Sequence, residues 1–223
     1  MDAAHSEPAT VRPSNQESYA PATARGRATR QRLLEAAIAE FGEKGFHAAS
    51  VSAITTRAGI GQGTFYIYFS SKEACYAVVV ESVSRLLRRA LLRGFSFLDL
   101  ESCLRESFAA YLRFCADQPY AMRALGEAQF IDEAIWREHT RRLVHCYTDL
   151  LERHAGANTL HTERELHATA IVGGLHGAAQ ALVASLEESG EEAAGLIHHQ
   201  ADALRDVALY GVGPRPQMPP LAG

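Results

Sequence analysis

The stretch from Ser50 to Lys72 reads SVSAITTRAGIGQGTFYIYFSSK and decides the fold of this chain. Val51 and Ile54 give a short helix an apolar face, and Gly59 ends that helix, as glycine does after a last turn. A second short helix is expected over residues 62–69. Two short helices joined by a glycine-containing turn of about three or four residues predict a helix-turn-helix, whose second helix enters the DNA major groove.

The second helix of this pair carries most of the side chains expected to meet DNA. Phe65 and Phe69 are four residues apart, so they share a face that can pack inward. Taken singly, the aromatic residues here could be core filler, but as an ordered string after a glycine turn they favour DNA binding. Hydroxyl groups, glycines and helix N-termini commonly approach phosphates. The predicted DNA-binding residues are Ser50, Gln62, Gly63, Thr64, Tyr66, Tyr68 and Lys72.

Two segments resemble a known family. Residues 58–74, AGIGQGTFYIYFSSKEA, resemble the signature of TetR-type transcriptional regulators. Residues 29–54, TRQRLLEAAIAEFGEKGFHAASVSAI, resemble the first helix of that family and the entry to its second. The resemblance covers roughly residues 27–87. Gly61 stands where the family often has Ser, and Gln62 stands where it often has Lys.

The resemblance and the helical periodicity together predict an all-α fold of about nine helices. An N-terminal three-helix helix-turn-helix domain would precede a helical C-terminal domain for ligand binding and dimerisation. The expected division is a disordered arm at 1–24, the DNA-binding domain at 25–72, the effector and dimerisation domain at 73–210 and a disordered tail at 211–223. Arg25, Arg27 and Arg30 either extend along DNA from the arm or have no such role.

The helix after the helix-turn-helix is expected to link the DNA-binding domain to the rest of the chain. Ser70 and Glu73 fit a capping box at its start, and its apolar pattern continues to about Arg93. Such a helix can act as a lever, because motion at its C-terminal half displaces the recognition helix.

Charge is divided unevenly along the chain. The 223 residues carry a net charge of −4, yet residues 25–72 hold seven basic and three acidic side chains. A basic head on an acidic body is typical of a protein that reads DNA with one part only. Asp2, His5 and Glu7 argue against a secretory signal, and no apolar run is expected to span a membrane. The predicted location is cytoplasmic.

Cysteine and histidine spacing indicates neither a disulfide framework nor a metal site. The four cysteines form no CxxC pair and are expected to be reduced, mostly buried thiols, with redox sensing by one of them left open. No histidine pair at the spacing of a helical metal site and no catalytic motif is found, so neither a metal, a cofactor nor an enzyme activity is expected.

One predicted helix, from about Thr162 to Glu188, has a face of small residues. Interior glycines cost a helix about 0.5–1 kcal/mol each relative to alanine, so a close neighbour or a ligand should compensate. We assign the face to homodimer packing, as the resemblance implies, with intrachain packing or the ligand cavity as alternatives. The face consists of Gly173, Gly174, Gly177 and Ala181.

The resemblance also implies a ligand cavity in the C-terminal domain. Aromatic and methionine side chains suit an apolar pocket, although at helical spacing each could equally be core. The candidate lining residues are Phe108, Tyr111, Phe114, Met122, Phe130, Trp136, Tyr147 and His176.

The expected function is that of a one-component, DNA-binding transcriptional regulator. It would be a homodimeric repressor, released from a palindromic double-stranded DNA operator by an at least partly apolar small-molecule effector, without a membrane partner. The alternative is an effector-binding adaptor that keeps the fold and does not bind DNA.

Overall fold

The computed structural model describes residues 23–97, 99–154, 161–189 and 193–210, which form helices and their connections without a strand. The expected tail lies outside the described residues. So does the expected arm, except for Thr23 and Ala24, which begin the first helix. The all-α prediction is confirmed. The first three helices are α1 (Ala24–Ala48), α2 (Val51–Ala58) and α3 (Gln62–Tyr68), which we call the head.

Local signals set the ends of the head helices. Thr23 Oγ1 accepts a hydrogen bond from the Gly26 amide, so α1 starts well before its first buried residue, Leu33. Gly45 breaks α1 before its last residues, because its φ of 77° is not helical. Ser50 caps α2 by accepting from Ala53, and Gly59 ends it with φ at 64°.

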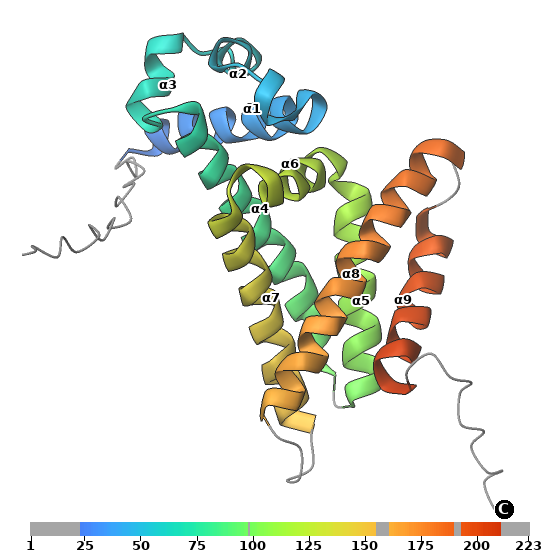
Figure 1. Ribbon diagram of the computed structural model, residues 1–223. Coiled ribbons are helices and arrows are strands. Elements are labelled where there is room, and N and C mark those ends of the chain that lie inside the picture. Colours follow the sequence, from blue (N-terminus) through green and yellow to red (C-terminus); the bar gives the residue numbers. More distant parts are fainter. Residues whose placement is uncertain (1–22, 98, 155–160, 190–192, 211–223) are drawn as a thin grey trace, which may run out of the picture.

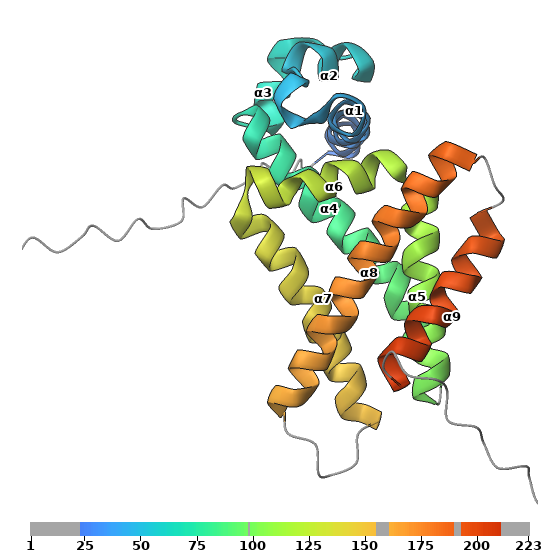
Figure 2. The same cartoon turned by 45° about the vertical axis from the view of Figure 1, so that its right-hand side comes forward.

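The remaining helices form the body. Figure 1 shows α4 descending from the head into the body, while Figures 1 and 2 both place α6 across the underside of the head. The elements are α4 (Lys72–Arg93), the short 3-10 helix η1 (Gly94–Ser96), α5 (Leu100–Asp117), α6 (Pro119–Ile131), α7 (Glu133–His154), α8 (His161–Ser189) and α9 (Ala193–Tyr210).

Two sequence expectations about body helices need correction. Ser71, not Ser70, caps α4, because its hydroxyl accepts from the Ala74 amide at 3.1 Å. Within the described residues, Thr162–Leu186 of α8 is long and apolar enough to span a membrane, with a mean hydropathy of 1.3. Length and composition alone do not separate a membrane span from a packed helix of a soluble domain.

The head and the body are joined through α6 as well as through α4. A Cβ atom on Gly42 of α1 would lie 2.3 Å from the Tyr120 carbonyl oxygen, so the two backbones touch there. The Phe46 amide donates to Glu127 Oε2 at 2.7 Å, which ties the end of α1 to α6. Tyr76 of α4 donates its hydroxyl proton to the Ala124 carbonyl at 2.7 Å. These contacts position α3 relative to the body.

Candidate DNA-contact surface and internal cavity

The outer face of α3 presents large side chains to solvent. Phe65 and Phe69 are buried, with ring centroids 5.3 Å apart, so they anchor the helix as their spacing predicts. Consequently Tyr66 projects outward with 54% of its surface exposed. Gln62 and Gly63 at the start of the helix are also exposed, whereas Thr64 and Tyr68 are half-buried. A Cβ atom on Gly63 would meet nothing within 4 Å.

Ile67 belongs to the same surface, although it is not among the residues predicted to bind DNA. Its side chain is 60% exposed beside Tyr66. An exposed apolar side chain on a recognition helix can contact the methyl group of thymine in the major groove. The signal was present in the sequence, because a helix that buries Phe65 and Phe69 must turn the residues between them outward.

Two predicted DNA-binding residues also have structural roles. Ser50 is exposed and caps α2. The Lys72 ammonium donates to the carbonyls of Phe46, His47 and Ala49 at 2.9, 3.4 and 3.1 Å. It also lies 4.5 Å from the centre of the Phe46 ring. Lys72 therefore stabilises, through its hydrogen bonds to main-chain carbonyls, the segment in which α1 ends and α2 begins.

Part of the positive charge of the head is neutralised internally. Lys44 Nζ lies 2.7 Å from Glu40, whose side chain is 2% exposed. Arg57 Nη1 donates to Glu43 at 3.0 Å, and Glu43 raises the pKa of this guanidinium. The seven basic residues counted from the sequence are thus not all available to phosphates.

A cavity of about 310 Å³ lies in the body between α5, α6, α7 and α8. Of the eight predicted lining residues, the structure brings Tyr111, Met122, Trp136 and His176 together around it. The other lining residues were not predicted, because most of them are aliphatic or small and carry no aromatic signal. They are Cys115, Arg123, Leu125, Gly126, Ala179, Gln180, Val183 and Ala184.

The other four predicted lining residues lie elsewhere. Phe108 and Tyr147 are buried in the core, and Tyr147 packs on Phe95 with centroids 5.3 Å apart. Phe114 lines a separate groove of about 240 Å³ near α4 and η1. Phe130 is 84% exposed, because it lies on the face of α6 that is turned to solvent.

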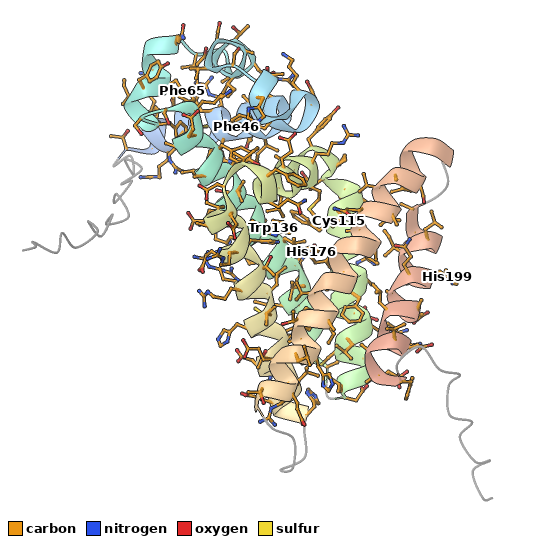
Figure 3. All side chains as sticks on the ribbon, in the orientation of Figure 1. Phe46, Phe65, Cys115, Trp136, His176 and His199 are labelled. Carbon is orange, nitrogen blue, oxygen red and sulfur yellow. The ribbon has the colours of Figure 1, made fainter. Side chains whose placement is uncertain are left out.

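Two buried histidines connect the cavity wall to α4. Figure 3 shows Trp136, His176 and Cys115 close together between the body helices. His176 Nε2 lies 3.4 Å from His139 Nε2, and His139 Nδ1 lies 2.7 Å from Ser84 Oγ on α4. Burial lowers the pKa of His139 to about 3 and that of His176 to about 4. Both rings are therefore neutral at physiological pH.

The predicted dimer face is largely open in the single chain. Gly173, Gly177 and Ala181 are exposed on α8, and a Cβ atom on either glycine would meet nothing within 4 Å. Gly174 differs, since its Cβ atom would lie 3.5 Å from Leu204 of α9. Three of the four residues thus form an unoccupied strip of small side chains, and Gly174 faces α9.

The cysteines have the surroundings of structural thiols. All four are free, and Cys75, Cys103 and Cys115 are buried. Burial raises the pKa of Cys75 to about 12 and also raises the pKa of Cys115. A reactive thiolate needs the opposite shift.

Comparisons with known proteins agree with this architecture. The family described as "Bacterial regulatory proteins, tetR family" matches residues 33–79, which include α2, α3 and the start of α4. An uncharacterized HTH-type transcriptional regulator of Bacillus subtilis, YdgC, is 45% identical over 65 residues, which are 29% of this chain and 33% of YdgC. The activator FasR of Mycolicibacterium smegmatis is 31% identical over 132 residues, 57% of this chain and 60% of FasR. The alignments span about a third of the length of the first matching relatives.

Solved structures extend the likeness to the body. A TetR-like regulator from Rhodococcus sp. RHA1 is 25% identical with a TM-score of 0.61, over 81% of this chain and 93% of that one. The regulator FadR from Bacillus subtilis, solved with stearoyl-CoA, has a TM-score of 0.66 at 14% identity, over 82% and 99% of the two chains. The second likeness concerns the fold alone. The helix-turn-helix of this chain therefore belongs to the TetR family of bacterial regulatory proteins, and its body has the fold of TetR-like regulators.

Proposed function

We propose that this protein is a DNA-binding transcriptional regulator whose head reads an operator with α3. The observation that carries the proposal is the exposed pair Tyr66 and Ile67, held outward by buried Phe65 and Phe69 on a helix that the family model covers. Large side chains that project from a helix-turn-helix are suited to base edges and sugar–phosphate groups. Gln62, Gly63 and Thr64 would lie at the groove entrance, with Ser50 and Tyr68 at its rim.

A homodimer would let this head read a palindrome. Two recognition helices must lie roughly 34–36 Å apart to enter successive major-groove turns. The open strip formed by Gly173, Gly177 and Ala181 offers a surface where a second copy of α8 could approach closely. Isologous packing of such a strip is the usual result of two-fold symmetry.

An effector in the cavity would act on the head through two routes. One route is α6, which lines the cavity with Leu125 and Gly126 and holds the head through Glu127. The other is the chain from His176 through His139 to Ser84 on the lever helix α4. A ligand that prefers a shifted α6 or α4 would change the spacing of the recognition helices, with couplings of about 1–3 kcal/mol typical. We propose that this releases DNA, as in a repressor.

The test is a salt series of binding to duplex DNA from the region upstream of this protein's own coding sequence, against random duplex. We expect sequence-selective binding that weakens steeply with salt, because phosphate contacts release counterions. Tyr66→Ala should weaken specific binding by about 30-fold or more, roughly 2 kcal/mol, at an unchanged melting temperature.

Phe130→Ala is the matched control, because it removes an aromatic ring from the body that is even more exposed than Tyr66. This variant should bind DNA like the unchanged protein. Flat salt dependence without selectivity, from a folded protein, would instead favour the adaptor that does not bind DNA. If a cavity ligand instead makes the protein bind DNA more tightly, the ligand recruits the protein to its operator and does not release it.

A further inference from the structure

The cavity contains a polar group without a protein partner. Tyr111 of α5 lines the cavity, its side chain is fully buried, and its hydroxyl makes no hydrogen bond within the described part of the chain. A buried hydroxyl that lacks a partner is destabilising, since folding removes its bonds to water. Burial also raises the pKa of Tyr111, so the hydroxyl stays protonated. It can therefore donate one hydrogen bond and accept another from a bound molecule.

One wall of the cavity is made of aromatic rings. The centroids of Trp136 and His176 are 5.0 Å apart with an angle of 36° between their planes. His139 continues this arrangement behind them, 5.4 Å from Trp136. Because His176 Nε2 already faces His139, the His176 ring contributes mainly its surface. A planar ring of a ligand would pack well against such a wall.

Apart from Arg123, the side chains that line the cavity carry no charge, and Arg88 lies behind this wall, where it helps to lower the pKa of His139. The buried histidines are neutral at physiological pH, and Met122, Leu125 and Val183 supply aliphatic walls. Among the lining residues, only Arg123 is charged, and its side chain is exposed. Burying an ionised group without a counter-charge is costly. An ionised group of a ligand would thus be unfavourable beside Tyr111.

The volume also restricts the ligand. The cavity of about 310 Å³ lies at the lower end of known ligand pockets. These observations describe a compact molecule rather than a long-chain one.

We propose that the effector is a small, uncharged molecule with a planar ring and one oxygen that hydrogen-bonds to the Tyr111 hydroxyl. The inference rests on the proposed function for the role of the cavity, and it adds the chemical class of the ligand and the residue that reads its polar group. Tyr111 would thus distinguish a hydroxylated or carbonyl-bearing ring from the bare hydrocarbon.

The test uses three probes with the same skeleton: para-cyclohexylphenol, cyclohexylbenzene and the anion para-cyclohexylbenzoate. Trp136 is the single tryptophan and lines the cavity, so its fluorescence reports binding directly. We expect the phenol to bind at least about tenfold more tightly than either other probe. In Tyr111→Phe, the preference for the phenol over the hydrocarbon should disappear, while the hydrocarbon affinity stays the same.

Tyr147→Phe is the matched control. Tyr147 is as buried as Tyr111, but its hydroxyl bonds to Ser107 at 3.2 Å and it does not line the cavity. This variant should lose thermal stability and keep the ligand preference. Tyr111→Phe should keep or raise the melting temperature, because it removes an unpaired group.

The proposal fails if the phenol does not bind, if the benzoate binds more tightly through Arg123, or if Tyr111→Phe leaves the preference intact. DNA binding of the same preparation is measured in parallel. If the protein binds its operator but does not prefer the phenol, only the proposed ligand class is overturned. A protein that shows the preference but binds no DNA overturns the proposed function alone.

Discussion

In the head, Tyr66 projects from α3 with more than half of its surface exposed, whereas in the body Tyr111 and Tyr147 are completely buried. The head is small, and Phe65 and Phe69 fill part of its interior, so Tyr66 is left exposed to solvent. The body has several helices between which aromatic rings such as Tyr111 and Tyr147 are buried, although Tyr120 and Tyr210 are exposed there. The position of a tyrosine relative to the core, and not its residue type, therefore decides whether it can contact a partner.

The largest expected effect comes from separating the two regions. Gly42→Val would force a side chain into the Tyr120 backbone, where even a Cβ atom comes within 2.3 Å. Overpacking of this kind typically costs about 1–3 kcal/mol, and because the obstacle is backbone we expect about 3 kcal/mol in chemical denaturation.

Gly63→Ala is the control for Gly42→Val, since its Cβ atom meets empty space. Replacing this helical glycine should stabilise the head by about 0.5 kcal/mol and still weaken DNA binding, because the backbone can no longer approach the groove closely. Equal stability losses in the two variants would show that the contact between α1 and α6 does not hold head and body together.

The next largest effect is a pH dependence of stability that arises in the body alone. The pKa values of His139 and His176 are lowered from 6.5 to about 3 and about 4, so the unfolded chain binds more protons than the folded one below pH 6.5. The two neutral histidines make their full contribution to the free energy of unfolding above pH 6.5. This contribution is lost as the pH falls, by up to about 1.4 kcal/mol per pH unit for each histidine. We expect a loss of about 2–3 kcal/mol between pH 6.5 and 5 in urea titrations.

His176→Gln should reduce that slope by about half, because one of the two buried imidazoles no longer titrates. Glu138 does not interfere, since Arg141 and Arg142 lower its pKa to about 2 and its contribution changes only below about pH 4.5. An unchanged slope in His176→Gln would mean that His176 is accessible to protons in the folded protein.

A smaller effect distinguishes two roles for Lys72 in the head. Its ammonium already meets three carbonyl oxygens, so Lys72→Met should lower the free energy of unfolding by about 1–2 kcal/mol. We expect the salt slope of DNA binding to stay unchanged, since no N–H group is left for a phosphate. A slope reduced by about one would establish the phosphate contact predicted from the sequence.

Lys44→Met provides the comparison, because Lys44 is the other lysine of the chain and half of its side chain is exposed. Its partner Glu40 keeps Arg57 at 3.7 Å after the change. Lys44→Met should therefore lower the free energy of unfolding by less than half as much as Lys72→Met.

The sequence was most informative where structure is set locally. Ser50, Gly59 and Pro119 mark helix ends through hydrogen bonds and backbone angles that involve only a few neighbouring residues. The helix-turn-helix could accordingly be predicted nearly to the residue. Hydrophobic periodicity does not reveal the start of α1 at Ala24, because the first buried residue of this helix is Leu33.

The cavity could be predicted only in part, because it depends on which side chains converge from four helices. Periodicity places Phe130 and Met122 on α6, but it does not tell which face of α6 meets solvent. Ala179 and Val183 line the cavity without any chemical signal of their own. The pairing of His139 with His176 joins residues 37 positions apart, so no local spacing could reveal it.

The joint between head and body has a practical consequence for protein engineering. Glu127 and Lys72 both hold main-chain atoms of the segment after Gly45, an amide in one case and carbonyls in the other. Main-chain partners are present whatever side chains occupy positions 46–49. Chimeras that combine the head of one family member with this body should thus dock through the same two residues, provided that the glycine turn is kept.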